Sequence, residues 1–285
     1  MPVSTVSSAA HSAFKNRTDM PSSLINSHGV YPLIVPQSAT VATFPRHIHH
    51  TKTDTPVSQP IFLFAYGSLI NPLSLKRTIG RQEAAVPVRV AGFKRWWGFN
   101  CVRRSYTAVS IAHTGRKEDM VNGVLIPLTN CDLISLDERE AGYLRKQISL
   151  KDVAAYNSEL HLQNVIIYAY VLEDDLEYDS DSSISSSITS HVACPRVPIP
   201  QSYVDCILIG ALLEHGHAFA KDFVQWTQGW HSGHWINDRY APHDVRRYVP
   251  NTQAGESDVA ESLADSVDSL LYSLIPKALE ARVPV

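Results

Sequence analysis

The sequence predicts a mixed or antiparallel α+β barrel with flanking helices and a helical C-terminal extension. Short stretches rich in β-branched and aromatic residues recur between residues 61 and 172, which is typical of strands. Helical spacing is confined to a few segments that do not alternate strictly with these strands, so a doubly wound parallel sheet is disfavoured. A long stretch with helical spacing follows residue 201, and this stretch predicts the extension.

The expected strands are short, largely apolar and bounded by polar or glycine-containing turns. They are Ile61–Ala65, Val86–Phe93, Thr107–Ala112, Val121–Leu128, a candidate that ends near Leu150, and Val165–Leu172. The first of them, in IFLFAYGSLI, is apolar throughout and is expected to be fully buried.

The expected helices have apolar residues at three- and four-residue intervals. They are a short helix opened by Asn71 and Pro72 and running to Ile79, then Asn130–Ala141, Ser202–Thr227 and the amphipathic stretch Val259–Leu274. Pro72 is near the first helical turn, where proline is accepted. Gly216 is expected to kink the long helix.

Composition divides the chain into three parts. Residues 1–58 are rich in Ser and Thr and poor in acidic residues, which indicates a disordered leader or an organelle transit peptide. Residues 59–250 form the expected folded domain, with an acidic, serine-rich insertion at 173–190 that offers no apolar core. Residues 251–285 are expected to be a tail whose amphipathic helix packs peripherally or serves a partner.

Charge and cysteine content exclude several classes of protein. The formal net charge of -3 over 285 residues gives no reason to expect nucleic acid as a partner. No window approaches the apolar length of a membrane helix. The four cysteines include no CxxC pair, so a disulfide framework or zinc site is disfavoured and a reducing compartment is expected. We therefore expect a cytoplasmic protein, with organelle import through the leader as the alternative.

The turn that follows the first strand has the chemistry of an anion receptor. Gly67 lets the backbone approach a ligand closely because it has no Cβ. Successive N–H groups in such a turn can bind an anion, and the helix that begins after Asn71 adds positive potential. The alternative interpretation is an ordinary strand-to-helix turn.

A second candidate lies in the stretch DLISLDEREAGYLRKQISL. Glu140 follows Leu136 by four residues and so shares the apolar stripe of its helix. A carboxylate there is paired, solvated in a cleft or shifted to a higher pKa, because burying it unpaired costs several kcal/mol. The alternative is a boundary residue paired with Arg139, Arg145 or Lys146.

Together, these two segments resemble the gamma-glutamylcyclotransferase-like superfamily, and the resemblance covers roughly residues 61–172. The segment FAYGSLINP is similar to the family's substrate loop, which implies that Tyr66, Gly67, Ser68 and Leu69 bind substrate.

The second motif of the family is a Leu-Asp-x-x-Glu segment followed by Tyr-x-Arg. Its match here implies that Glu140 is the catalytic acid and base, with Asp137 on the same face as the fallback. Tyr143 and Arg145 are then expected to shape the pocket wall or the next strand.

The activity implied by the resemblance is release of 5-oxoproline from gamma-glutamyl amino acids, glutathione or a glutathione conjugate, a cofactor-free lyase or acyltransferase of glutathione metabolism. Its partner is a small gamma-glutamyl molecule, and the oligomeric state is left open. Two alternatives remain: a noncatalytic binding module on the same fold, and a gamma-glutamylamine cyclotransferase. No G-x-S-x-G motif surrounds Ser68, so a serine hydrolase is disfavoured.

Other clusters point less clearly to a function. The histidines in HIHH, HGH and GWHSGHW have no Cys or carboxylate at a convincing spacing, so no metal site is expected. Four basic residues around Trp96 and Trp97 suggest a basic aromatic surface, which alone does not predict RNA binding: Lys94, Arg95, Arg103 and Arg104.

Overall fold

The computed structural model describes residues 59–101, 104–156, 161–172, 193–231, 234–242, 244–248 and 257–285, with side chains from residue 263 in the last range. All of them belong to the unit Thr51–Val285. The expected leader at 1–58 and the insertion at 173–190 lie outside these residues.

The largest sheet has six strands in the order β6-β8-β1-β5-β2-β7. Its members are β1 (Ile61–Ala65), β2 (Val86–Ala91), β5 (Met120–Leu128), β6 (Leu144–Ile148), β7 (Val153–Ala155) and β8 (Ile166–Val171). β1 is parallel to β8, whereas the other neighbours are antiparallel. The sheet is therefore mixed, and the predicted α+β class is confirmed.

Two smaller sheets complete the β structure, with orders β10-β3-β4 and β12-β11-β9. Their strands are β3 (Phe93–Cys101), β4 (Tyr106–His113), β9 (Ile199–Pro200), β10 (Thr227–Gln228), β11 (Trp235–Asn237) and β12 (Val283–Pro284). Pairing among the described strands does not close the expected barrel. Contacts of β3 with β5 and of β4 with β8 instead pack the β10-β3-β4 sheet against the six-stranded sheet.

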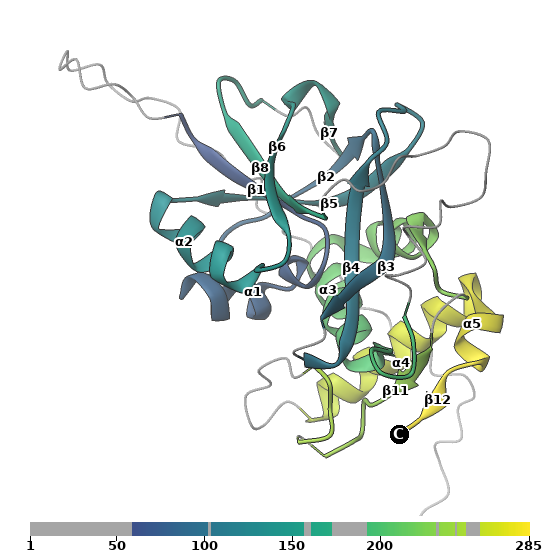
Figure 1. The fold of residues 1–285 in the computed structure, drawn as a ribbon. Helices are drawn as coiled ribbons and strands as arrows, with labels where there is room; N and C mark the ends of the chain where they lie inside the picture. The colour runs from purple at the N-terminus through teal and green to yellow at the C-terminus, as the bar shows by residue number, and fades with distance from the viewer. Residues whose placement is uncertain are drawn as a thin grey trace, which may run out of the picture. The chain divides into compact units, whose positions relative to one another are not determined.

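The helices follow the sequence prediction closely (Figure 1). They are η1 (Ser68–Ile70), α1 (Pro72–Ile79), α2 (Asn130–Arg139), η3 (Leu150–Asp152), α3 (Gln201–Trp226), α4 (Ser257–Leu274) and α5 (Pro276–Glu280). The expected kink in α3 is confirmed, because Gly216 has φ 82° and ψ 176° within the helix. Such a positive φ suits glycine, which has no Cβ to clash.

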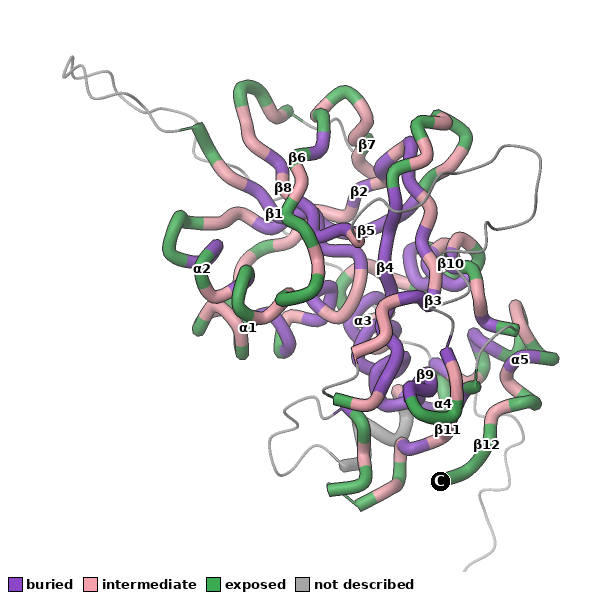
Figure 2. Tube along the Cα trace, viewed as in Figure 1, coloured by how far each residue is buried: buried purple, intermediate pink, exposed green. Residues whose placement is uncertain are grey.

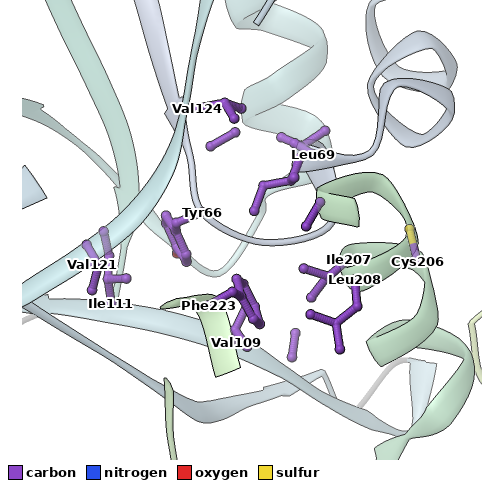
Figure 3. Packing of buried hydrophobic residues seen from close by; sticks show 14 of the residues in the cluster. Tyr66, Leu69, Val109, Ile111, Val121, Val124, Cys206, Ile207, Leu208 and Phe223 are labelled. Atoms are coloured by element: carbon purple, nitrogen blue, oxygen red, sulfur yellow. The ribbon is translucent and has the colours of Figure 1, made fainter. Parts of the chain in front are cut away.

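The core lies between the sheets and α3. Figure 2 shows buried chain along β1, β4, β5 and α3. Figure 3 shows how Tyr66 and Leu69, from the end of β1 and η1, pack in one apolar cluster with Val109 of β4 and with Ile207 and Phe223 of α3. The cluster fixes the loop after β1 against both a strand and a helix, and this loop forms the site described below.

Arg95 lies inside this core, so the expected basic aromatic surface at this position is wrong. The side chain is fully buried, and its N–H groups donate to Thr227 Oγ1 (2.7 Å), to the Asn122 side chain and carbonyl (both 2.8 Å) and to the carbonyls of Phe223 (3.0 Å) and Tyr66 (3.3 Å). Burial lowers the pKa of Arg95 to about 9. The guanidinium thus hydrogen-bonds to β5, to α3 and to Tyr66 at the start of the candidate loop.

The C-terminal helix α4 contains the predicted amphipathic stretch and packs on α3. Val267, Leu270 and Leu271 on its inner face are at most 2% exposed. Arg239 joins the two helices, because it contacts Asp205 of α3 (2.7 Å) and Asp268 of α4 (2.9 Å). The tail is therefore part of the same core.

Candidate active site

The loop after β1 is a single turn of 3₁₀ helix that leads directly into α1. Ile70 N donates to Gly67 O (2.9 Å) and Asn71 N to Ser68 O (3.2 Å). These are the first hydrogen bonds of the turn, so the N–H groups of Ser68 and Leu69 have no acceptor within it. The turn thus presents two backbone donors at the end of a buried strand.

Gly67 is required by close packing. A Cβ at this position would lie 2.9 Å from Val109 Cγ2 and 3.3 Å from the hydroxyl oxygen of Tyr203. The first distance is shorter than van der Waals contact between carbon atoms. Gly67 therefore allows β4 and α3 to close around the loop.

Asn71 joins the end of the loop to α3. Its side-chain oxygen accepts a hydrogen bond from Leu73 N (3.0 Å) and caps α1, while its side-chain nitrogen donates to Cys206 O (2.8 Å). A Cβ on Gly210 would lie 2.6 Å from Asn71 Cα. The helix of the C-terminal extension thus supports the loop at backbone-to-backbone distance.

Glu140 is the C-cap residue that directly follows α2. Its N–H donates to Leu136 O (2.8 Å), so it keeps the helical position predicted four residues after the fully buried Leu136. Its side chain is 19% exposed and accepts a hydrogen bond from Arg139 Nε (3.0 Å). Of the alternatives considered for Glu140, the pairing with Arg139 is therefore present in the structure.

One cavity brings the two motifs together. It has about 360 Å³ of unfilled space, its open mouth included. The residues around it come from β1, the loop, β4, the end of α2, β8 and α3: Leu63, Phe64, Ala65, Tyr66, Gly67, Ser68, Leu69, Val109, Glu140, Tyr143, Tyr170 and Tyr203. The five residues predicted for the site therefore line the same cavity: Tyr66, Gly67, Ser68, Leu69 and Glu140.

The electrostatics of the cavity are set by burial. Burial raises the pKa of Glu140 above its usual value, although the cations Arg139 and Arg104 oppose the shift. Burial also raises the pKa values of Tyr66, Tyr143 and Tyr203. These phenols therefore remain neutral around neutral pH, and among the described residues that line the cavity Glu140 is the one acidic side chain.

Asp137, the fallback on the same face of the helix, is not among the residues that line this cavity. Its side chain is 47% exposed, accepts a hydrogen bond from Tyr170 Oη (2.7 Å) and pairs with Arg145 (3.0 Å). These contacts hold the Asp137 side chain toward β6 and β8. Arg145 lies in β6 on that side, whereas Tyr143 lines the cavity and donates its hydroxyl to Val109 O (2.9 Å).

Two tyrosines of the lining were not predicted as site residues. Tyr203 precedes Ile207 by four residues, so it belongs to the apolar stripe predicted for α3, and this pattern was the available signal. Tyr170 lies in β8, and its carbonyl accepts the hydroxyl of Tyr66 (2.5 Å). The local sequence of Tyr170 carries no comparable signal that it faces a cavity.

The described residues hold neither a metal-ligand cluster nor a membrane-spanning helix. Within the described residues, no group of three or more His, Cys, Asp or Glu side chains is placed to hold a metal ion. None of the helices in the described part of the chain combines the length and apolar character that a membrane crossing requires. The histidines of HIHH lie outside the described residues.

The chain as a whole is similar to several solved structures. No family model and no curated protein sequence matches the chain. An uncharacterised human protein and a structure titled gamma-glutamyl cyclotransferase are each similar at 16% identity and a TM-score of 0.43, covering 71% and 72% of this chain and 99% of their own. A glutathione-specific gamma-glutamyl cyclotransferase from yeast is similar at 10% identity and a TM-score of 0.33, covering 74% of this chain and 97% of its own.

The family expected from the two motifs is thus represented among the structural neighbours. At these identities and scores the function proposed below rests on the residues around the cavity and on the motifs.

Proposed function

We propose that this chain is a gamma-glutamylcyclotransferase that releases 5-oxoproline from gamma-glutamyl amino acids, glutathione or a glutathione conjugate. The observation that carries the proposal is that the Glu140 carboxylate lines the same cavity as the Gly67–Ser68 turn. A proton acceptor and the turn that carries the Ser68 and Leu69 backbone donors therefore line one cavity.

The reaction would be intramolecular. The α-amine of the gamma-glutamyl group attacks its own side-chain carbonyl carbon, a new C–N bond closes the five-membered ring, and the original amide C–N bond breaks. No water or co-substrate is consumed. The main requirement is orientation, and holding a molecule in attack geometry can lower a barrier by about 7–11 kcal/mol.

Glu140 would move the proton. An α-amine has a pKa of about 8, so it is mostly an ammonium at neutral pH and must lose a proton before attack. The Glu140 carboxylate accepts that proton and returns it to the departing nitrogen. Its raised pKa suits both steps, because a group that titrates closer to the working pH exchanges protons more readily in each direction.

The loop would bind the charged end of the substrate. The N–H groups of Ser68 and Leu69 can donate to the α-carboxylate or to the oxygen that becomes negative as the ring closes. Neutral tyrosines around Glu140 exclude water without adding competing charge.

The test is a panel of gamma-glutamyl substrates with 5-oxoproline as the readout. Glu140→Gln removes the proton acceptor and keeps the shape, so turnover is expected to fall by about 100-fold or more. Glu138→Gln is the matched control, since Glu138 is exposed on the same helix. A folded Glu140→Gln protein with undiminished turnover would overturn the proposal.

The same panel separates the remaining alternatives. Product from gamma-glutamyl-lysine but not from glutathione would indicate a gamma-glutamylamine cyclotransferase. Calorimetric binding of a gamma-glutamyl compound with no product would indicate a binding module. Loss of turnover in Asp137→Asn but not in Glu140→Gln would move the proton-transfer role to the other acid.

A further inference from the structure

The Arg139 guanidinium has an acceptor for every one of its N–H donors. Nε donates to Glu140 Oε1 (3.0 Å), and Nη2 donates to Ser68 Oγ (3.0 Å) and Ser74 Oγ (2.9 Å). Nη1 donates to Ser74 O (3.1 Å) and Thr78 Oγ1 (2.5 Å). A guanidinium has five N–H bonds in a rigid plane, so none is left for a ligand.

The acceptors belong to three different elements. Glu140 directly follows α2, Ser68 begins η1, and Ser74 and Thr78 lie on α1. The Arg139 side chain is only 18% exposed. One planar group thus connects the cavity's carboxylate to the hydroxyl of the substrate turn and anchors both to α1.

We propose that Arg139 is a positioning residue that holds the Glu140 carboxylate and the Ser68 hydroxyl in one fixed arrangement across the cavity. The inference rests on the proposed function. It assigns Arg139 a role distinct from binding substrate, because a substrate carboxylate could reach the guanidinium only by displacing one of its five acceptors. Neither motif names this residue.

The arrangement also supplies positive charge to Glu140. The other groups that face this carboxylate are Arg104, whose charge acts in the same direction, and the phenols of Tyr66, Tyr143, Tyr170 and Tyr203. Burial raises the pKa values of these four phenols, so they do not titrate at acidic pH. Loss of the Arg139 charge would therefore raise the pKa at which Glu140 becomes a carboxylate.

Two variants of Arg139 separate charge from geometry. Arg139→Gln removes both the positive charge and the planar guanidinium. Arg139→Lys keeps the charge, but its ammonium group cannot reach all the separate acceptors that the guanidinium contacts. We expect kcat for 5-oxoproline release to fall about 10–100-fold in both variants, as small misplacements of catalytic groups do, with a smaller change in KM. The acidic limb of the pH profile should move up by about one unit or more in Arg139→Gln and stay near its wild-type position in Arg139→Lys.

Arg116→Gln is the matched control, because Arg116 pairs with Asp119 in the β4–β5 turn, away from the cavity. It should leave kcat and the pH profile unchanged. Wild-type kcat in Arg139→Lys, or an unshifted acidic limb in Arg139→Gln, would overturn the positioning role. If Arg139→Gln fails to fold, the kcat of Arg139→Lys alone tests the positioning role.

A second readout keeps this inference separate from the proposed function. Carbon-13 NMR of labelled glutamate side chains reports the Glu140 titration whether or not the protein turns over substrate, and Glu140→Gln identifies its signal. If wild type releases no 5-oxoproline, the proposed function fails, but an upward shift of the Glu140 titration in Arg139→Gln would still support the contact between the two groups. An unchanged titration would refute it.

Discussion

Glu140 carries a stability cost at neutral pH that follows from its position in the cavity. Its pKa in the folded protein lies above the value of 4.5 expected in the unfolded chain. Between these two values the folded state binds more protons than the unfolded state, so the free energy of unfolding falls as pH rises through this window. Such a cost is common where a group serves chemistry.

We therefore predict that Glu140→Gln becomes stabilised relative to wild type as pH rises from below 4.5 through the folded pKa, and that the difference then levels off. Glutamine can still accept the Arg139 hydrogen bond, so the change isolates the charge. Urea unfolding of both proteins between pH 4 and 8 measures the difference. A difference that does not vary with pH would contradict the prediction.

Gly210 offers a test of how closely α3 supports the loop. A methyl group there would lie 2.6 Å from Asn71 Cα, and a backbone atom cannot move aside cheaply. We predict that Gly210→Ala lowers the free energy of unfolding by about 1–3 kcal/mol and reduces 5-oxoproline release by displacing the turn. Leu213→Ala on the exposed side of α3 should change stability by no more than about 0.5 kcal/mol. Equal stability of the two variants would show that the contact is not tight.

At this scale the sequence predicted some site residues and could not predict others, for a physical reason. Glu140 could be predicted from the sequence because helical spacing places it on the apolar stripe that contains Leu136. The sequence offered Arg139 only as one of three pairing partners for Glu140. Its contacts with Ser68 and Ser74 join segments far apart in the chain, which local spacing cannot indicate. Gly67 was predicted for ligand approach, whereas the structure shows it also makes room for Val109 and Tyr203.

Helix α2, which presents Glu140, is fixed at its start by a capping box. Thr129 accepts a hydrogen bond from Asp132 N (3.3 Å), and Asp132 in turn accepts one from Thr129 N (2.7 Å). Arg81 also contacts the carboxylate through two N–H groups (2.5 and 2.6 Å) and holds the pKa of Asp132 down to about 2. The start of the helix is thus tied to the segment after α1.

We predict that Asp132→Asn lowers the free energy of unfolding at pH 7 by about 1 kcal/mol, chiefly through the cap. The side chain of Arg81 is 37% exposed, so the ion pair adds little in water. Because the pKa of Asp132 is depressed, its charge stabilises the fold above pH 3.8 and this effect is lost as pH falls toward 2. Urea unfolding at pH 7 and pH 2.5 checks this, and an equal loss at both values would contradict it.

Among the strands, regular patterning decided which ones the sequence could predict. β1, β4, β5 and β8 are apolar runs, and their prediction is confirmed. β3 was not predicted beyond Phe93, because a buried Arg95 and a bulge between Trp97 and Phe99 break its pattern. The strands β9 to β12 have two or three residues each, and pairings between distant segments define them. Local sequence holds no signal for such pairings.

At the scale of the whole molecule, the C-terminal helices support the site through α3. α4 packs on α3 (Figure 1). α3 in turn supplies Tyr203 to the cavity and the Asn71 contact to the loop. The sequence left open whether the tail packs on the domain or serves a partner, because an amphipathic stripe does not specify what covers it. In the structure the apolar face of α4 packs on α3.

Because α4 supports α3 and α3 supports the loop, we predict that a substitution on α4, far from the cavity, destabilises the fold. Leu271 on α4 is fully buried, whereas its neighbour Tyr272 is 61% exposed. Leu271→Ala should lower the free energy of unfolding by about 2–5 kcal/mol, since it leaves a cavity between α4 and α3. The control Tyr272→Ala removes a larger side chain from solvent and should have little effect.

The same pair of variants tests whether support reaches the loop. Loss of packing on α3 should increase amide hydrogen exchange at residues 68–75, where the loop and α1 depend on Asn71, Cys206 and Gly210 for their position. Tyr272→Ala should leave exchange there at the wild-type rate. If Leu271→Ala destabilises α4 and exchange at residues 68–75 stays unchanged, the loop holds its position without the C-terminal helices, and α3 alone suffices to build the cavity.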